Sequence, residues 1–321
     1  MKNTLITIFK VLIFVAVVVW VVFELHKSWD KICQVSWRAD YYWLFFSALF
    51  YFLAYIPASL FWRYSMWSLG QRPGIYESLR AYYIGHLGKY VPGKAIVVVL
   101  RSGLLNLERT QASVAAAAVF LETLTMMASG AFLSALIVFI WFRGMENGMW
   151  LMLLSFAVLL CAGVPVIPPV FRWLAKRLGV GRFDPYIDQK LLGLRVKTLA
   201  VGFGLTILTW LMLGLSLWGV VNGIGLGSGS LWANGGELMA RFTLAASFSV
   251  VLGFVLMMPG GIGVRDFVLA QVLTVYFAGV LGNGNDLSLA ASYAIVAAGV
   301  QRLISIFVEL LAAVVMFRKP K

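Results

Sequence analysis

Long apolar runs constrain this 321-residue chain more than any other feature of its sequence. The run Ala115–Ile140, for example, contains a single charged residue, Glu122. A helix needs about 20 mostly apolar residues to cross a bilayer, and only helices and closed barrels pair all their backbone groups there. Barrel strands would read as short alternating segments, which the sequence does not contain. We therefore expect an all-α, polytopic membrane protein.

Six apolar runs predict full membrane spans. The first resembles a signal peptide, because Lys2 and Lys10 precede it, but no small-residue cleavage pattern follows and we expect a retained span. Charged residues make up 12% of the chain, against about 25% in soluble domains, which agrees with this interpretation. The predicted spans cover residues 5–23, 43–67, 111–142, 149–170, 197–222 and 288–316.

Two further apolar stretches, 75–105 and 238–281, are interrupted near the middle by proline and glycine. Proline removes a helical hydrogen bond, and glycine permits a sharp reversal. We therefore expect two re-entrant hairpins of broken helices, with an ordinary kinked span as the alternative for each. The interruptions read Tyr90-Val91-Pro92-Gly93-Lys94 and Met258-Pro259-Gly260-Gly261-Ile262-Gly263.

Basic residues set the expected sidedness of the loops. Segment 172–197 is rich in Lys and Arg, as is the chain end at Arg318–Lys321, and such segments favour the cytoplasmic side. Connections with little charge should face outward, and these are 143–148, 223–236 and 282–287.

This sidedness predicts an internal repeat. With the N-terminus inside, the loop assignments agree if both interrupted stretches are re-entrant, or if 238–281 crosses the membrane twice. Residues 1–148 and 149–321 then form two repeats of inverted orientation within one membrane domain, a pattern typical of transporters. We expect the plasma (inner) membrane, with both termini cytoplasmic.

Charged residues inside apolar helices are the best pointers to function, because each is costly unless it is paired or hydrated. Glu122, Arg265 and Arg302 favour a functional role, with Glu122 and Arg302 as expected partners across the repeats. We predict that a lipid headgroup is bound and translocated by Lys89, Tyr90, Pro92, Gly93, Lys94, Arg101, Glu122, Pro259, Gly260, Gly261, Gly263, Arg265, Asp266 and Arg302.

Two qualifications accompany this set. Lys89, Arg101 and Glu309 fit structural ion pairs or snorkelling side chains as well as they fit a functional site. A half-helix that begins at Gly261–Val264 would direct unpaired N–H groups at an anion, and Arg265 beside it suits a phosphate.

Other kinds of chemistry lack a signal. The sequence shows no nucleophile–base pair, and Cys33 and Cys161 lie far apart, so we expect no catalytic residue, metal or cofactor. A net charge of +13 would suggest nucleic acid in a soluble protein. Here the basic residues lie between spans, where topology and anionic lipid explain them, so we expect no nucleic acid partner.

Four strings carry a family resemblance: Gly88-Lys89-Tyr90-Val91-Pro92-Gly93-Lys94 with Arg101, Phe120-Leu121-Glu122, Met258-Pro259-Gly260-Gly261-Ile262-Gly263-Val264-Arg265-Asp266, and Gln301-Arg302-Leu303. They resemble motifs of the lysylphosphatidylglycerol synthase transmembrane region, also called the flippase-like domain family. The resemblance spans most of the chain, and the third string is the most specific.

The resemblance implies a translocator that moves a polar or anionic lipid between leaflets, such as an aminoacyl phospholipid or a polyprenyl-linked glycolipid. Synthase members also carry a soluble aminoacyl-transferase domain, which this sequence lacks, so synthesis is not implied. Two alternatives stay open: an integral membrane glycosyl- or lipid-transferase, and a scaffold that recruits a lipid-synthesis enzyme through 172–197. Besides the membrane and its lipid, the partners left open are a second copy of the chain and a lipid-synthesis enzyme.

Overall fold

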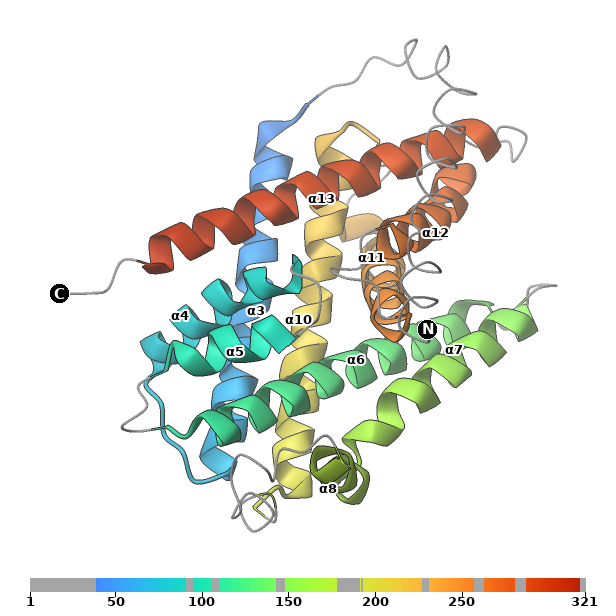
Figure 1. Cartoon of the computed structure of the whole chain (residues 1–321). Coiled ribbons are helices and arrows are strands. Elements are labelled where there is room, and N and C mark those ends of the chain that lie inside the picture. Colours follow the sequence, from blue (N-terminus) through green and yellow to red (C-terminus); the bar gives the residue numbers. More distant parts are fainter. Residues whose placement is uncertain are drawn as a thin grey trace, which may run out of the picture. The chain divides into compact units, whose positions relative to one another are not determined.

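The computed structural model describes residues 39–90, 95–105, 110–142, 148–177, 191, 193–226, 231–256, 263–280 and 287–317. These residues form helices joined by turns, and none of them lies in a strand. The all-α membrane class expected from the apolar runs is confirmed, since five helices are long and apolar enough to cross a membrane. The described chain is traced in Figure 1.

The helices follow one another with short connections. Along the chain they are α3 (Tyr41–Ser68), α4 (Ile75–His86), the 3-10 turn η1 (Leu87–Tyr90), α5 (Ala95–Gly103), α6 (Ala112–Phe142), α7 (Gly148–Gly163), the 3-10 turn η2 (Val164–Val166), α8 (Pro168–Arg177), α10 (Val196–Gly223), α11 (Leu231–Val255), α12 (Val264–Val280) and α13 (Leu287–Phe317).

Four of the six predicted spans coincide with helices long enough to cross, namely α3, α6, α10 and α13. The predicted span 5–23 lies outside the described residues. The predicted span 149–170 is too long, because α7 ends at Gly163 and the chain continues through η2 into α8. Proline at positions 165, 168 and 169 explains the early end, since each lacks the N–H that would continue the helix.

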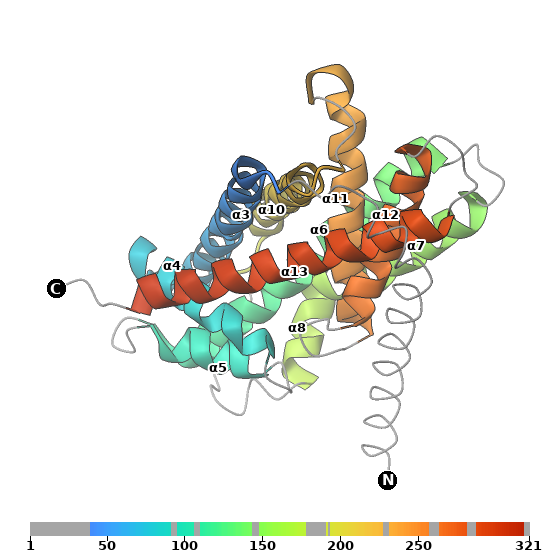
Figure 2. The ribbon, with the colours of Figure 1, turned by 90° about the horizontal axis from the view of Figure 1, so that it is seen from above.

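The first interrupted stretch forms a pair of short helices packed against each other, α4 and α5 (Figures 1 and 2). At 1.5 Å per residue, 12 and 9 residues reach only about 18 and 14 Å, so neither helix can cross about 30 Å of hydrocarbon. These lengths agree with the expected re-entrant hairpin. Its Pro-Gly interruption, 91–94, lies outside the described residues.

The second interrupted stretch forms α11 and α12, which also pack against each other. Its residues Gly235–Val255 are long and apolar enough to cross a membrane, whereas α12 has 17 residues. The two broken stretches therefore differ in length. Of the second interruption, 258–263, only Gly263 belongs to the described residues, and its φ of 85° is one that glycine adopts readily.

The structure divides into two compact units. Unit 1 comprises the described residues of Met1–Phe50 and Leu213–Ile306, and unit 2 those of Tyr51–Met212 and Phe307–Lys321. Unit 1 has an aromatic core around Trp218, Phe242 and Phe277. The core of unit 2 gathers apolar side chains from α3, α6 and α8, among them Phe61, Leu121 and Phe171. The inverted repeats stay a prediction.

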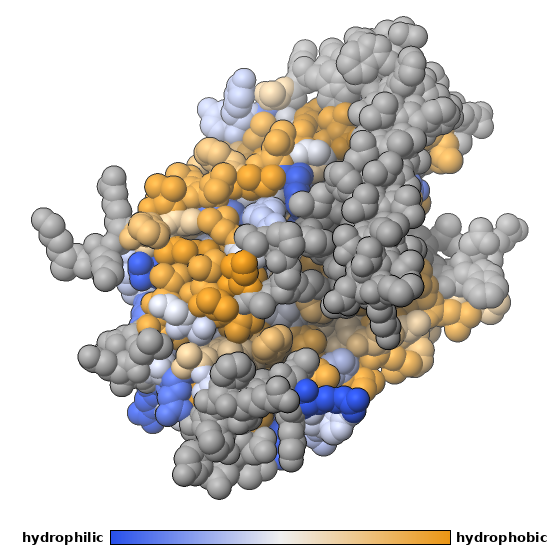
Figure 3. Space-filling model, viewed as in Figure 1, coloured by the Kyte–Doolittle hydropathy of each residue, from blue (hydrophilic) through white to orange (hydrophobic). Residues whose placement is uncertain are grey.

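Large apolar side chains are exposed along α13, where Figure 3 shows them gathered on the C-terminal half of the helix. They include Phe307, Leu310, Leu311, Val314 and Val315. In a soluble protein such a surface would aggregate, whereas in a membrane it meets hydrocarbon at no cost.

Close backbone approach holds the α4–α5 hairpin together. A Cβ added to Gly88 in η1 would lie 2.8 Å from the backbone nitrogen of Val97 in α5. Backbone cannot rotate away as a flexible side chain can, so this site accepts no side chain without separation of the two helices. Gly88 therefore fixes η1, and with it Lys89 and Tyr90, against α5.

We expect Gly88→Ala to lower the free energy of unfolding by about 1–3 kcal/mol, the usual cost of overpacking. The matched control is Gly103→Ala in α5, where a Cβ would meet nothing within 4 Å. Thermal unfolding in detergent measures both variants. Equal midpoints for the two would show that η1 does not depend on this contact.

Candidate functional site

The polar residues of unit 2 are organised by α4 and η1. Glu77 caps the start of α4, where its carboxylate accepts a hydrogen bond of 3.2 Å from the backbone N–H of Gly74. Tyr82, His86 and Lys89 then follow at spacings of four and three residues, which places them on one face of the helical segment. We call these three residues the α4–η1 polar face.

At one end of this face lies a buried ion pair between Arg101 of α5 and Glu122 of α6. Arg101 Nη1 donates to Glu122 Oε2 at 2.8 Å, and both side chains are at most 3% exposed. The hydroxyl of Tyr82 donates to Glu122 Oε1 at 2.8 Å, so both carboxylate oxygens accept a hydrogen bond. The guanidinium of Arg101 also lies 3.7 Å from the centre of the Tyr82 ring, which adds a cation–π contact. This pair joins the hairpin to α6.

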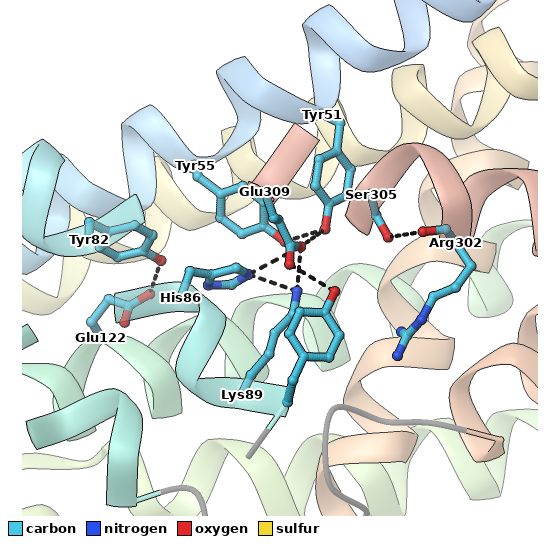
Figure 4. A network of polar contacts seen from close by, with 10 residues as sticks. Tyr51, Tyr55, Tyr82, His86, Lys89, Glu122, Arg302, Ser305 and Glu309 are labelled. Carbon is cyan, nitrogen blue, oxygen red and sulfur yellow. Dashed lines mark hydrogen bonds and ion pairs between the residues drawn. The ribbon is translucent and has the colours of Figure 1, made fainter. Parts of the chain in front are cut away.

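At the other end of the face lies the carboxylate of Glu309, on α13 (Figure 4). It forms an ion pair with Lys89 and accepts a hydrogen bond of 2.8 Å from the hydroxyl of Tyr90. The hydroxyl of Tyr51, from α3, is a further donor to the same carboxylate. His86 Nε2 lies 3.7 Å from it. We call these five residues the Glu309 cluster.

The two carboxylates are connected through α4. The rings of Tyr82 and His86 are stacked, with an interplanar angle of 13° and centroids 6.2 Å apart. His86 Nε2 in turn lies 3.0 Å from Lys89 Nζ. The α4–η1 polar face thus runs without interruption from the Glu122 pair to the Glu309 cluster, and Figure 4 shows both in one view.

The two ends differ in exposure. Arg101 and Glu122 are closed off on both sides, whereas in the Glu309 cluster only the carboxylate is closed off. The Glu309 side chain is 3% exposed, against 20% for Lys89 and 17% for His86. The open side of the cluster therefore presents cationic and hydrogen-bond-donating groups, and these groups attract an anion.

The structure brings four predicted site residues together in unit 2: Lys89, Tyr90, Arg101 and Glu122. The expected partner of Glu122 was Arg302, but both partners of this carboxylate come from the first broken stretch. The predicted residues Pro92, Gly93, Lys94, Pro259, Gly260 and Gly261 lie outside the described residues.

The remaining predicted residues belong to unit 1. Gly263, Arg265 and Asp266 lie at the start of α12, where the N–H of Gly263 is 3.5 Å from the Asp266 carboxylate. Arg302 lies on α13, and the Ser305 hydroxyl donates to its carbonyl oxygen at 2.8 Å. A role for these four in headgroup binding stays a prediction.

Sequence reasoning left several residues of the site unselected. Glu309 was weighed equally as a structural residue, and His86 as a lone histidine carried no signal of its own. Tyr51 and Tyr82 look like ordinary aromatics of a membrane protein. The usable signal was spacing: Tyr82 and His86 are four residues apart, and Lys89 follows three later.

We expect Glu122→Gln to destabilise the protein by about 3–5 kcal/mol, because it leaves the Arg101 guanidinium buried without its counter-ion. Glu237→Gln is the matched control, since Glu237 forms an ion pair with Arg241 on the surface of α11, with both side chains more than 40% exposed. Exposed pairs contribute about 0–1 kcal/mol.

Thermal unfolding in detergent tests this difference. The double variant Arg101→Met with Glu122→Gln should recover part of the loss, because it removes both charges. A midpoint for Glu122→Gln that matches Glu237→Gln would refute the pinning role of the buried pair.

The described residues contain no group of three or more His, Cys, Asp or Glu arranged to hold a metal ion. A model of one protein family, the Lysylphosphatidylglycerol synthase TM region, matches residues 7–313, nearly the whole chain. No curated protein and no solved structure matches the chain.

Proposed function

We propose that this chain, which belongs to the family of the lysylphosphatidylglycerol synthase transmembrane region, moves a polar or anionic lipid between membrane leaflets. Candidate lipids are an aminoacyl phospholipid and a polyprenyl-linked glycolipid. The protein then lies in the plasma (inner) membrane, with both termini on the cytoplasmic side. The Glu309 cluster is the observation that carries the proposal.

A lipid headgroup needs a polar route through the membrane, because an unpaired charge is strongly disfavoured in hydrocarbon. The Glu309 cluster provides such polarity among apolar helices. Its Lys89 and Tyr90 immediately precede the Pro-Gly interruption of a hairpin whose helices are too short to cross. Ionisable residues in this setting mark substrate pathways more often than structural sites.

The hairpin also supplies an arrangement in which a route can form. Helices broken inside the membrane are typical of transporters, where their ends meet the substrate. In unit 2, Gly88 holds η1 against α5, and the Arg101–Glu122 pair holds α5 against α6. These contacts keep the donors of Lys89 and Tyr90 in place, so a headgroup would meet a preorganised site.

Within unit 1 we propose that Arg265 and Arg302 bind phosphate along the route. Arginine donates paired hydrogen bonds from a planar fork, whereas lysine keeps only the charge. Arg265 follows Gly263 at the start of α12, where N–H groups of the first turn favour an anion.

The test is reconstitution in liposomes with a fluorescent phosphatidylglycerol, followed by reduction of the dye in the outer leaflet. We expect Lys89→Ala, Arg265→Ala and Arg302→Ala to move lipid at least about tenfold more slowly, because each loses a charged hydrogen bond worth about 1.5–3 kcal/mol. Arg265→Lys should keep partial activity.

The control for this assay is Arg241→Ala, which removes an exposed arginine from α11. It should move lipid at the wild-type rate. Wild-type rates in all three alanine variants of the route, with a lipid that the wild type does move, would contradict the proposal. Chemical conversion of a lipid-linked sugar without translocation would favour the transferase instead.

A further inference from the structure

We propose that the Glu309 cluster is an anion site for a phosphate or phosphodiester, and that the protein's own Glu309 carboxylate occupies it when no ligand is bound. Lys89 is the residue that changes partner. Its ammonium pairs with Glu309 in this structure and turns to the ligand phosphate when a headgroup arrives. The inference rests on the proposed function, because it names the ligand chemistry of the same site.

The direction of exposure favours an anion over a cation. A ligand that approaches from the open side meets Lys89 and His86 first, since these side chains are several-fold more exposed than Glu309. A cationic ligand would have to reach the closed carboxylate and would lie beside the Lys89 ammonium. Like charges at this distance repel, and the repulsion is stronger where water is excluded.

The cluster can release Lys89 without leaving a bare carboxylate. Glu309 accepts hydrogen bonds from the hydroxyls of Tyr51 and Tyr90 as well as from Lys89. The phenol of Tyr51 is buried, and it also lies 3.1 Å from the hydroxyl of Tyr55, which can steady it. A carboxylate that keeps such donors avoids most of the penalty of an unsatisfied buried group.

Lys89 is suited to the exchange by its side chain. A lysine ammonium is a compact charge on a flexible four-carbon stem, so it can move between two anions without displacing the backbone. η1 itself stays fixed, because Gly88 lies in backbone contact with α5. The exchange therefore requires rotation about side-chain bonds of one residue, with His86 Nε2 only 3.0 Å from the ammonium in its present position.

This arrangement makes an unusual prediction about sign. If Glu309 were a direct ligand of the substrate, its removal would weaken binding. If it competes with the substrate for Lys89, its removal strengthens binding. The two roles are thus separated by a single isosteric substitution, Glu309→Gln, which keeps the shape of the side chain and an oxygen acceptor for the tyrosines.

The experiment is calorimetric titration of the purified, detergent-solubilised protein with dioctanoyl phosphatidylglycerol, with inorganic phosphate and with glycerol phosphate in separate arms. We expect Glu309→Gln to bind the lipid at least about threefold more tightly than the wild type. Lys89→Met should bind about tenfold or more weakly, because a charge-assisted hydrogen bond is lost. Lys89→Arg should bind within a few-fold of the wild type, and Glu237→Gln should bind as the wild type does.

The arms also identify the source of the phosphate. The same pattern of variants with inorganic phosphate assigns the site to free phosphate, and the pattern with lipid alone assigns it to a headgroup; both outcomes support the anion site. Weaker or unchanged lipid binding in Glu309→Gln overturns it.

Folding is controlled by the double variant Lys89→Met with Glu309→Gln, which removes both charges of the pair. It should unfold near the wild-type temperature and bind poorly, and wild-type affinity in this variant also overturns the proposal. Failure of lipid transport with the binding pattern intact would count against the proposed function and leave the anion site standing. Transport without the binding pattern would do the reverse.

Discussion

An ionised carboxylate buried among apolar helices needs a cation, because removal of an ion from water costs several kcal/mol even after the protein relaxes. Unit 2 buries two such carboxylates, Glu122 and Glu309, and each forms an ion pair. The partners, Arg101 and Lys89, both come from the short α4–α5 hairpin and its 3-10 turn. The position of this hairpin therefore depends on electrostatics as much as on apolar packing.

The two pairs have different consequences because their surroundings differ. Arg101 and Glu122 are closed on every side, and Tyr82 completes the hydrogen bonds of the carboxylate. Such a pair specifies an arrangement and offers nothing to a ligand. The Lys89–Glu309 pair is closed at the carboxylate and partly open at the ammonium. One pair fixes the hairpin, and the other provides the site that a headgroup can enter.

Much of the fold could be predicted from the sequence, because the bilayer leaves a long apolar run little choice but a helix. Glu122 could also be singled out, since a lone charge in such a run demands a partner. The identity of that partner could not, because Arg101 lies 21 residues away on a nine-residue helix and meets Glu122 only through tertiary packing. Lys89 and Glu309, 220 residues apart, are a stronger case of the same limit. The span 149–170 was overextended, because its average hydropathy hides the prolines that end α7.

The central claim is that the Lys89 ammonium exchanges the Glu309 carboxylate for a lipid phosphate. Solid-state NMR tests it most directly, as the dephasing of lysine side-chain ¹⁵N signals by lipid ³¹P in proteoliposomes, with Lys89→Met used to assign the Lys89 signal. A lysine hydrogen-bonded to phosphate, with N···O of about 2.8 Å, lies close enough to be strongly dephased. We predict dephasing of the Lys89 signal in the wild type and stronger dephasing in Glu309→Gln. A Lys89 signal untouched by ³¹P in both proteins would contradict the account.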